Sequence, residues 1–154
     1  NMAFDHKGNY TVVLQDGTGT PISYTVPDAG DFKFDGIEAD NQGIVAIYNR
    51  LAYAGAAPTD ERTITGSFSL NRVKESWTHA SNKRIADAVA GTGAWSSGVT
   101  VDPAGEVWMM DIVYSDGTNS VTFITCRLML GVDESSTPTK ETVSFTCYQG
   151  VTLA

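Results

Sequence analysis

The sequence predicts a mainly β protein, with β-sandwich or barrel-like sheets, one flanking α-helix at about residues 81–90 and a long loop at about residues 28–61. The clearest support is residues 62–73, where large apolar side chains alternate with Thr and Ser. Residues 142–148 repeat this alternation. A period of two is typical of a strand that buries one face and leaves the other in water. Two such strands need a second layer to cover their apolar faces, so a layered β fold is expected.

Length and composition fit a single domain over residues 1–154. The chain has 154 residues, of which 42% are hydrophobic, enough to bury a core. Its formal charge of -8 at pH 7 disfavours tight binding to nucleic acid or to anionic lipid. No apolar run approaches the ~18 to 20 residues of a membrane span, so no membrane partner is expected.

Two hairpins are predicted, one before and one after the strand at 62–73 along the chain. Residues 10–14 and 22–26 both alternate, and the Gly- and Thr-rich segment between them supplies a turn. Residues 106–115 and 118–130 flank the strong turn signal Asp116-Gly117. The strand at 106–115 is apolar on both faces, which indicates a central position. A slip in apolar parity between Phe123 and Ile124 predicts a β-bulge.

The segments between these strands are read as one loop and one helix. Residues 28–61 are punctuated by glycine and contain one short strand-like run at 43–48, and a loop this long is usually functional. In the helix at 81–90, Ser81 or Asn82 can cap the N-terminus and Gly91 can take the left-handed position after the last turn.

Residues able to carry chemistry are scarce. Ser76, His79 and Asp87 form the only local set that could make a catalytic triad, and no nucleophile elbow surrounds any serine. There are two histidines, no Cys-x-x-Cys pair and no complete glycine-rich nucleotide motif. The sequence therefore predicts no catalytic residues, no metal and no cofactor. Cys126 and Cys147 are expected to be buried thiols, with a cross-strand disulfide as the alternative if their strands are neighbours.

One family has this order of elements. Over roughly residues 8–152, the chain resembles the major tail tube proteins of long-tailed (siphovirus-like) bacteriophages. The resemblance is carried by the first hairpin and long loop, then by Thr65-Gly66-Ser67-Phe68-Ser69-Leu70, Ile85-Ala86-Asp87-Ala88-Val89-Ala90-Gly91-Thr92-Gly93-Ala94-Trp95, and Ser144-Phe145-Thr146 ahead of Gly150.

The resemblance implies a virion structural protein in the phage tail, assembled in the cytoplasm of the bacterial host. Its subunits would form hexameric rings around an inner β-barrel, and the rings would stack into a tube. Its partners would be other copies of itself, other tail proteins and DNA as a weakly contacted, transiting cargo, which a net negative subunit would repel.

Two sets of site residues follow from this reading. The loop at 44–58 is expected to join stacked rings, with Tyr48, Leu51 and Tyr53 as apolar anchors and Arg50 as a charge partner. The lumen-facing candidates are Thr63, Thr65, Ser67, Ser69, Thr142, Ser144 and Thr146.

Two other readings remain open. The first is a capsid decoration protein, a head-tail completion protein or a tail terminator protein. The second is a β-sandwich that binds a small ligand or a carbohydrate, for which Trp77 and Trp95 would have to build an exposed aromatic platform.

Overall fold

The computed structural model describes residues 9–26, 29–37, 44–58, 64–73, 77–79, 84–135 and 137–154. The strands along the chain are β1 (Thr11–Gln15), β2 (Ser23–Thr25), β3 (Ala29–Asp35), β4 (Ile44–Asn49), β5 (Ala52–Pro58), β6 (Ile64–Asn71), β7 (Met110–Ser115), β8 (Ser120–Asp133), β9 (Lys140–Cys147) and β10 (Val151–Leu153). A short helix α1 (Ile85–Ala90) and a 3₁₀ helix at Gly93–Ser97 lie between β6 and β7.

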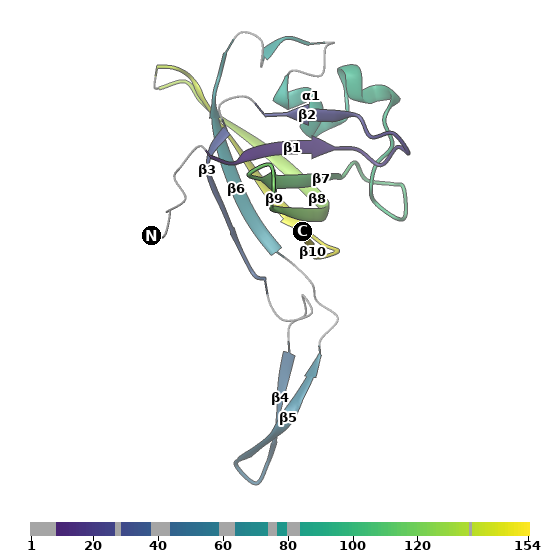
Figure 1. The fold of residues 1–154 in the computed structure, drawn as a ribbon, viewed down its shortest axis with the longest axis vertical. Helices are drawn as coiled ribbons and strands as arrows, with labels where there is room; N and C mark the ends of the chain where they lie inside the picture. The colour runs from purple at the N-terminus through teal and green to yellow at the C-terminus, as the bar shows by residue number, and fades with distance from the viewer. Residues whose placement is uncertain are drawn as a thin grey trace.

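Strand β8 is shared by two antiparallel layers (Figure 1). Its first half pairs with β7 and β10, and this layer continues through β1 to β2. Its second half pairs with β9, and the other layer continues through β6 to β3. The described residues are mainly in β-strands, and these strands form no closed barrel. This confirms the predicted fold class.

The change of layer coincides with the predicted bulge in β8. The register of β7 against β8 shifts between Met110 and Ile112, opposite residues 123–126. Thr125 has a φ of 59°, and its N–H bonds to the Asp111 carboxylate at 2.9 Å instead of to the strand ladder. An extra residue in one strand bends it and increases its twist, so β8 can leave one sheet and enter the next.

The core lies between the two layers and follows the predicted alternation. Ile64, Phe68 and Leu70 of β6 are buried, as are Val143 and Phe145 of β9. The first layer contributes Val12, Leu14, Tyr24, Met110, Ile112 and Phe123. The predicted apolar faces of residues 62–73 and 142–148 are therefore confirmed for the described residues.

The helix is shorter than the predicted 81–90. It begins at Ile85, and the predicted caps Ser81 and Asn82 lie outside the described residues. Gly91 has a φ of 71° and ends the helix as expected. Ile85 and Ala88 are buried in the core, so the helix packs one face against it.

The prediction of a loop at 28–61 is right only for the short strand-like run at 43–48, which forms β4. Residues 29–35 form β3, which pairs with β6, and residues 52–58 form β5, which pairs with β4 in a two-stranded sheet of its own. The hairpin turns on Arg50 and Leu51, with φ of 51° and 69°. Two-residue turns of this kind normally contain Asn-Gly or Asp-Gly. This one therefore gives no sequence signal, and the Ala- and Gly-rich β5 has low β-propensity.

Two further boundaries differ from the prediction. The strand expected at 106–115 begins at Met110, because the Thr100 hydroxyl donates to the Val107 carbonyl and accepts the Met109 N–H. Strand β10 was not predicted, since three residues are too few for a period to be read. Among the described residues, no helix is long and apolar enough to cross a membrane.

Candidate assembly surfaces

A face of hydroxyl side chains covers the outside of the β6–β9 pair. Three cross-strand pairs build it, namely Thr65 with Thr146, Ser67 with Ser144, and Ser69 with Thr142. Six of the seven predicted lumen-facing residues therefore lie together on one face, and Thr63 lies outside the described residues. Ser69 departs from the wetted pattern, because it is buried and its hydroxyl donates to the Asp31 carboxylate at 3.1 Å.

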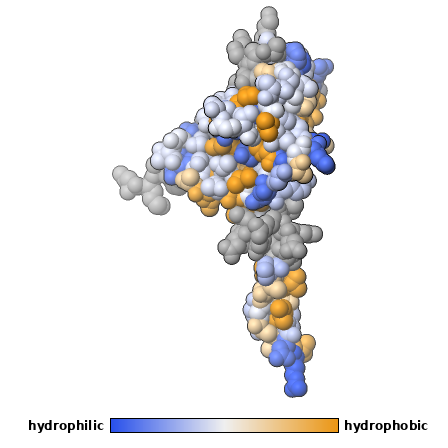
Figure 2. All heavy atoms as spheres, turned by 90° about the vertical axis from the view of Figure 1, so that its right-hand side faces the viewer, coloured by the Kyte–Doolittle hydropathy of each residue, from blue (hydrophilic) through white to orange (hydrophobic). Residues whose placement is uncertain are grey.

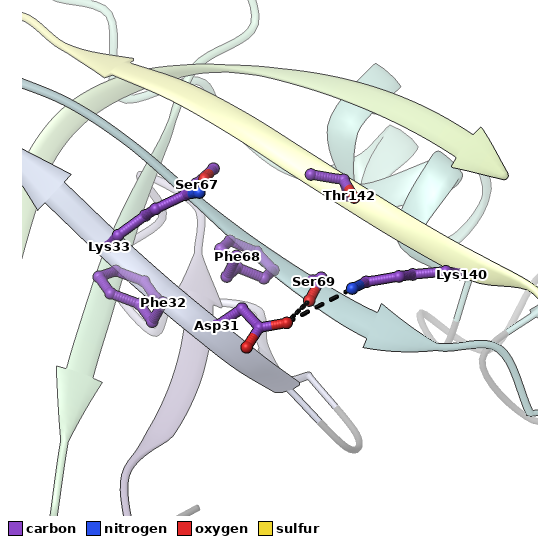
Figure 3. Close-up of a pocket in the computed structure, with 8 residues that line it drawn as sticks. All are labelled: Asp31, Phe32, Lys33, Ser67, Phe68, Ser69, Lys140 and Thr142. Atoms are coloured by element: carbon purple, nitrogen blue, oxygen red, sulfur yellow. Dashed lines mark hydrogen bonds and ion pairs between the residues drawn. The ribbon is translucent and has the colours of Figure 1, made fainter. Parts of the chain in front are cut away.

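Neighbouring strands extend this hydroxyl face with charges that the sequence pattern had not assigned to it. Pairing places Lys33 and Asp35 of β3 beside β6, and Arg127 and Met129 of β8 beside β9. The Lys140 ammonium lies 3.4 Å from the Asp31 carboxylate across the face (Figure 3). The charged side chains of the described face are Lys33, Arg127, Lys140, Asp31, Asp35 and Asp133.

These three cations and three anions balance, whereas the whole chain carries a net charge of -8. The expected repulsion of DNA by a negative subunit therefore does not describe this face, because the excess acidic residues lie elsewhere. Two shallow depressions of about 410 and 500 Å³ follow β3 and β6, and both are lined by Lys33 and Ser67. Figure 3 shows the first of them. Hydrogen bonds from Ser135 and the charge of Lys140 hold the pKa of Asp133 below its ordinary value, so this carboxylate is ionised at neutral pH.

The layer that carries the hydroxyl face ends in a free strand on each side. Strand β3 pairs only with β6, and residues 127–133 of β8 pair only with β9, within the part of the chain that the structure describes. Unpaired strands of this length are ready templates for pairing with another chain.

The direction of the backbone groups along these edges follows from the ladder. Antiparallel pairing alternates residues bonded to the partner strand with residues whose N–H and C=O point away from it. The Tyr148 N–H donates to the Thr125 carbonyl at 3.0 Å. Thr125 and every second residue after it therefore face β9, whereas the backbone N–H and C=O groups of Leu128, Leu130 and Val132 point to the free side of β8. The same alternation, continued across β9 and β6, directs the backbone groups of Phe34 to the free side of β3.

The hairpin β4–β5 projects from the body as an arm (Figure 1). Large apolar side chains lie along it, and its tip is hydrophilic (Figure 2). The four predicted ring-joining residues all lie at the far end, where Tyr48 is 65% exposed, Tyr53 63% and Leu51 101%. Tyr48 and Tyr53 face each other across the strands, with ring centroids 6.1 Å apart, and Arg50 is exposed beside them.

A buried polar cluster lies at the end of the hydroxyl-bearing layer where β6 ends and β9 begins. Glu141 is fully buried, and its carboxylate accepts a bond from the Arg72 guanidinium at 3.2 Å. That guanidinium also stacks 3.5 Å over the ring of Trp77. Burial raises the pKa of Glu141, and the contact with Arg72 opposes the rise. Burial, together with the charge of Glu141, raises the pKa of Tyr24 to about 12.

The residues considered for chemistry have structural partners. Asp87 is buried, receives two bonds from Arg84 and one from Thr92, and lies 2.7 Å from His79. Burial alone would raise the pKa of Asp87, but these bonds outweigh it and hold the pKa below its ordinary value. The third member of the possible triad, Ser76, lies outside the described residues.

Neither an aromatic platform nor a metal cluster emerges from the described residues. Trp95 is completely buried against Trp108, and Arg72 covers a face of Trp77. A carbohydrate platform built from Trp77 and Trp95 is therefore not formed. No group of three or more His, Cys, Asp and Glu side chains in the described ranges is placed to hold a metal ion.

Comparison with known proteins gives one structural similarity. No protein-family model matches the chain, and no curated protein sequence matches it. Among solved structures, the chain is similar to the cryo-EM structure of the anti-feeding prophage cap, described as the AFP tube terminating cap. The identity is 13%, the match covers 100% of this chain and 95% of that chain, and the TM-score is 0.49.

Proposed function

We propose that the chain is a non-catalytic structural subunit of a phage tail tube, assembling with copies of itself into hexameric rings that stack into a channel for DNA. The proposal rests on the layer β8–β9–β6–β3, which has a hydroxyl face and, among the described residues, a strand at each edge with no partner on its outer side. Pairing of β3 in one subunit with the second half of β8 in the next would continue the sheet around a ring. Closure of the ring would remove both edges.

The hydroxyl face would line the channel. Thr and Ser side chains are polar but uncharged, and the three cations and three anions of this face cancel. Affinity for DNA comes chiefly from cations that neutralise phosphates, so a face with no net charge would hold DNA weakly and let it move. Lys140 is already paired with Asp31, which reduces its pull on phosphate further.

The arm β4–β5 would join one ring to the next. An isolated two-stranded hairpin is marginally stable in water, so exposed Tyr48, Leu51 and Tyr53 favour a partner surface. The positive φ of Arg50 and Leu51 costs roughly 1–2 kcal/mol per residue. Such strain persists where a tight turn has a use, here the presentation of Leu51 and Arg50 at the tip.

The rival structural roles differ in how assembly stops. A decoration, completion or terminator protein would form one closed oligomer and grow no further. A tube subunit repeats a head-to-tail contact that never closes along the tube axis, so it grows with concentration.

The experiment compares Leu51→Asp with Leu153→Asp by sedimentation velocity and negative-stain electron microscopy. Both leucines are exposed, but Leu153 lies in β10 on the body rather than on the arm. We expect Leu51→Asp to give unstacked rings and Leu153→Asp to give tubes like the parent protein. Tubes of unchanged length from Leu51→Asp would remove the arm from the proposal, and uniform small particles from the parent protein at every concentration would overturn the tube.

A further inference from the structure

The two cysteines of the chain lie opposite each other on neighbouring strands. Cys126 of β8 and Cys147 of β9 are register partners, both fully buried and both free thiols. Register partners in an antiparallel pair project their side chains to the same face of the sheet, which here is the core face shared with Val143 and Phe145.

The hydrogen-bond pattern places this pair at the closer type of site. The neighbouring pair is bonded, because the Tyr148 N–H donates to the Thr125 carbonyl at 3.0 Å. By alternation, Cys126 and Cys147 form a non-hydrogen-bonded pair, for which the Cα atoms typically lie about 4.5 Å apart. A disulfide needs a Cα separation of about 4.4–6.8 Å, so this type of cross-strand pair is compatible with one.

The pair also lies at a mechanically important point. Met110 of β7 pairs with Cys126 on one side, and Cys147 of β9 pairs with it on the other. This is where β8 leaves one layer and enters the next, directly after the bulge at Thr125. A covalent link here would tie β8 to β9 at the point where β8 changes layer.

We propose that the folded chain carries a native disulfide site, at which Cys126 and Cys147 join when the protein meets a low-molecular-weight disulfide. A thiolate of Cys147 attacks the small disulfide, forms a mixed disulfide and expels one thiolate. The thiolate of Cys126 then attacks the Cys147 sulfur, closes the Cys126–Cys147 bond and expels the second. The two protein thiols lose two electrons and two protons, and the small disulfide becomes two thiols.

The local contacts favour Cys147 as the first nucleophile. The neighbouring Cys126 thiol lowers the pKa of Cys147 although burial acts against it, and the same contact, with burial, raises the pKa of Cys126. The Cys147 thiol contacts the carbonyl of Gly150 at 3.0 Å, just ahead of β10. Because β10 is a three-residue edge strand and Tyr148 and Gln149 are exposed, local opening at this end would admit the oxidant.

The test titrates the folded protein in glutathione buffers from reducing to oxidising, and reads the products by intact mass and by peptide mapping. We expect one link between Cys126 and Cys147. Cys126→Ala and Cys147→Ala are matched controls that cannot form it. The link should raise the thermal midpoint by roughly 5–10 °C, and should survive a more reducing buffer in the folded chain than in urea.

A second preparation, refolded from urea in oxidising buffer, covers the case in which the folded protein reacts slowly. Free thiols in both preparations would overturn the proposal. So would a link that lowers the midpoint or that is no more resistant to reduction in the folded chain than in urea, because native geometry would then oppose it. This inference does not depend on tube formation, so failure of either leaves the other standing.

Discussion

Val132→Pro tests whether the free edge of β8 is an assembly surface. Val132 lies near the end of β8, is 45% exposed and directs its N–H away from β9. Proline therefore removes no bond to β9. The preceding residue, Gly131, has no Cβ for the proline ring to meet, and edge strands tolerate proline when its nitrogen faces outward. The variant should fold with a thermal midpoint close to that of the parent chain.

Val132→Pro should instead weaken the contact between subunits. Proline deletes one outward donor and displaces the bonds on either side of it, and each bond contributes about 0.5–1.5 kcal/mol. A loss of about 2–3 kcal/mol per contact corresponds to roughly 30- to 150-fold weaker association. Because a ring repeats this contact at every subunit, assembly should disappear at concentrations where the parent protein assembles fully.

Sedimentation velocity across a concentration series measures the effect. Val132→Thr is the matched control, since it keeps the β-branched shape and the N–H while changing the polarity of the side chain. We expect Val132→Thr to assemble like the parent protein and Val132→Pro to stay monomeric. A folded Val132→Pro that assembles at the parent concentration would refute pairing through this edge.

Three further predictions concern stability. Gly66→Ala should cost about 1–3 kcal/mol in chemical denaturation, because its Cβ would lie 2.5 Å from the Lys33 carbonyl oxygen and from the Phe145 ring, whereas Gly19→Ala meets nothing within 4 Å and should be near neutral. Asp87→Asn should cost about 1–3 kcal/mol by weakening the bonds from Arg84. Because the pKa of Asp87 is lowered in the folded chain, its protonation should destabilise the parent chain in acid, and this loss of stability should be smaller in Asp87→Asn. The raised pKa of Tyr24 means that the folded chain holds this proton more tightly than the unfolded chain. Stability should therefore fall as pH rises from 10.0 toward about 12, and this fall should be smaller in Tyr24→Phe. A fall of the same size in the variant would contradict the prediction.

The parts of the fold that sequence predicted are those with a strong local signal. The alternation of β6 and β9 gave both the core face and the hydroxyl face, because side chains in a strand alternate whatever the topology. The Asp116-Gly117 turn and the slip at Phe123 gave the second hairpin and the bulge. The pairing of β6 with β9 could not be predicted from local signals, because it joins segments far apart in the chain.

The arm was missed for a different reason. Its turn uses Arg50 and Leu51 where Asn-Gly would be expected, and β5 consists largely of small residues. The four exposed residues at its end were still selected from the composition of the segment. The charges on the hydroxyl face could not be assigned, because a register shift in β3 between Gly30 and Lys33 decides which of its side chains reach that face.

Electron microscopy of the purified protein over a range of concentrations would show directly whether the chain builds a tube. We expect rings that give way to stacked tubes as concentration rises, with an open channel and a continuous β wall built by β3 and β8 of adjacent subunits. Uniform small particles at every concentration, or a tube wall in which these two edges do not meet, would contradict this expectation.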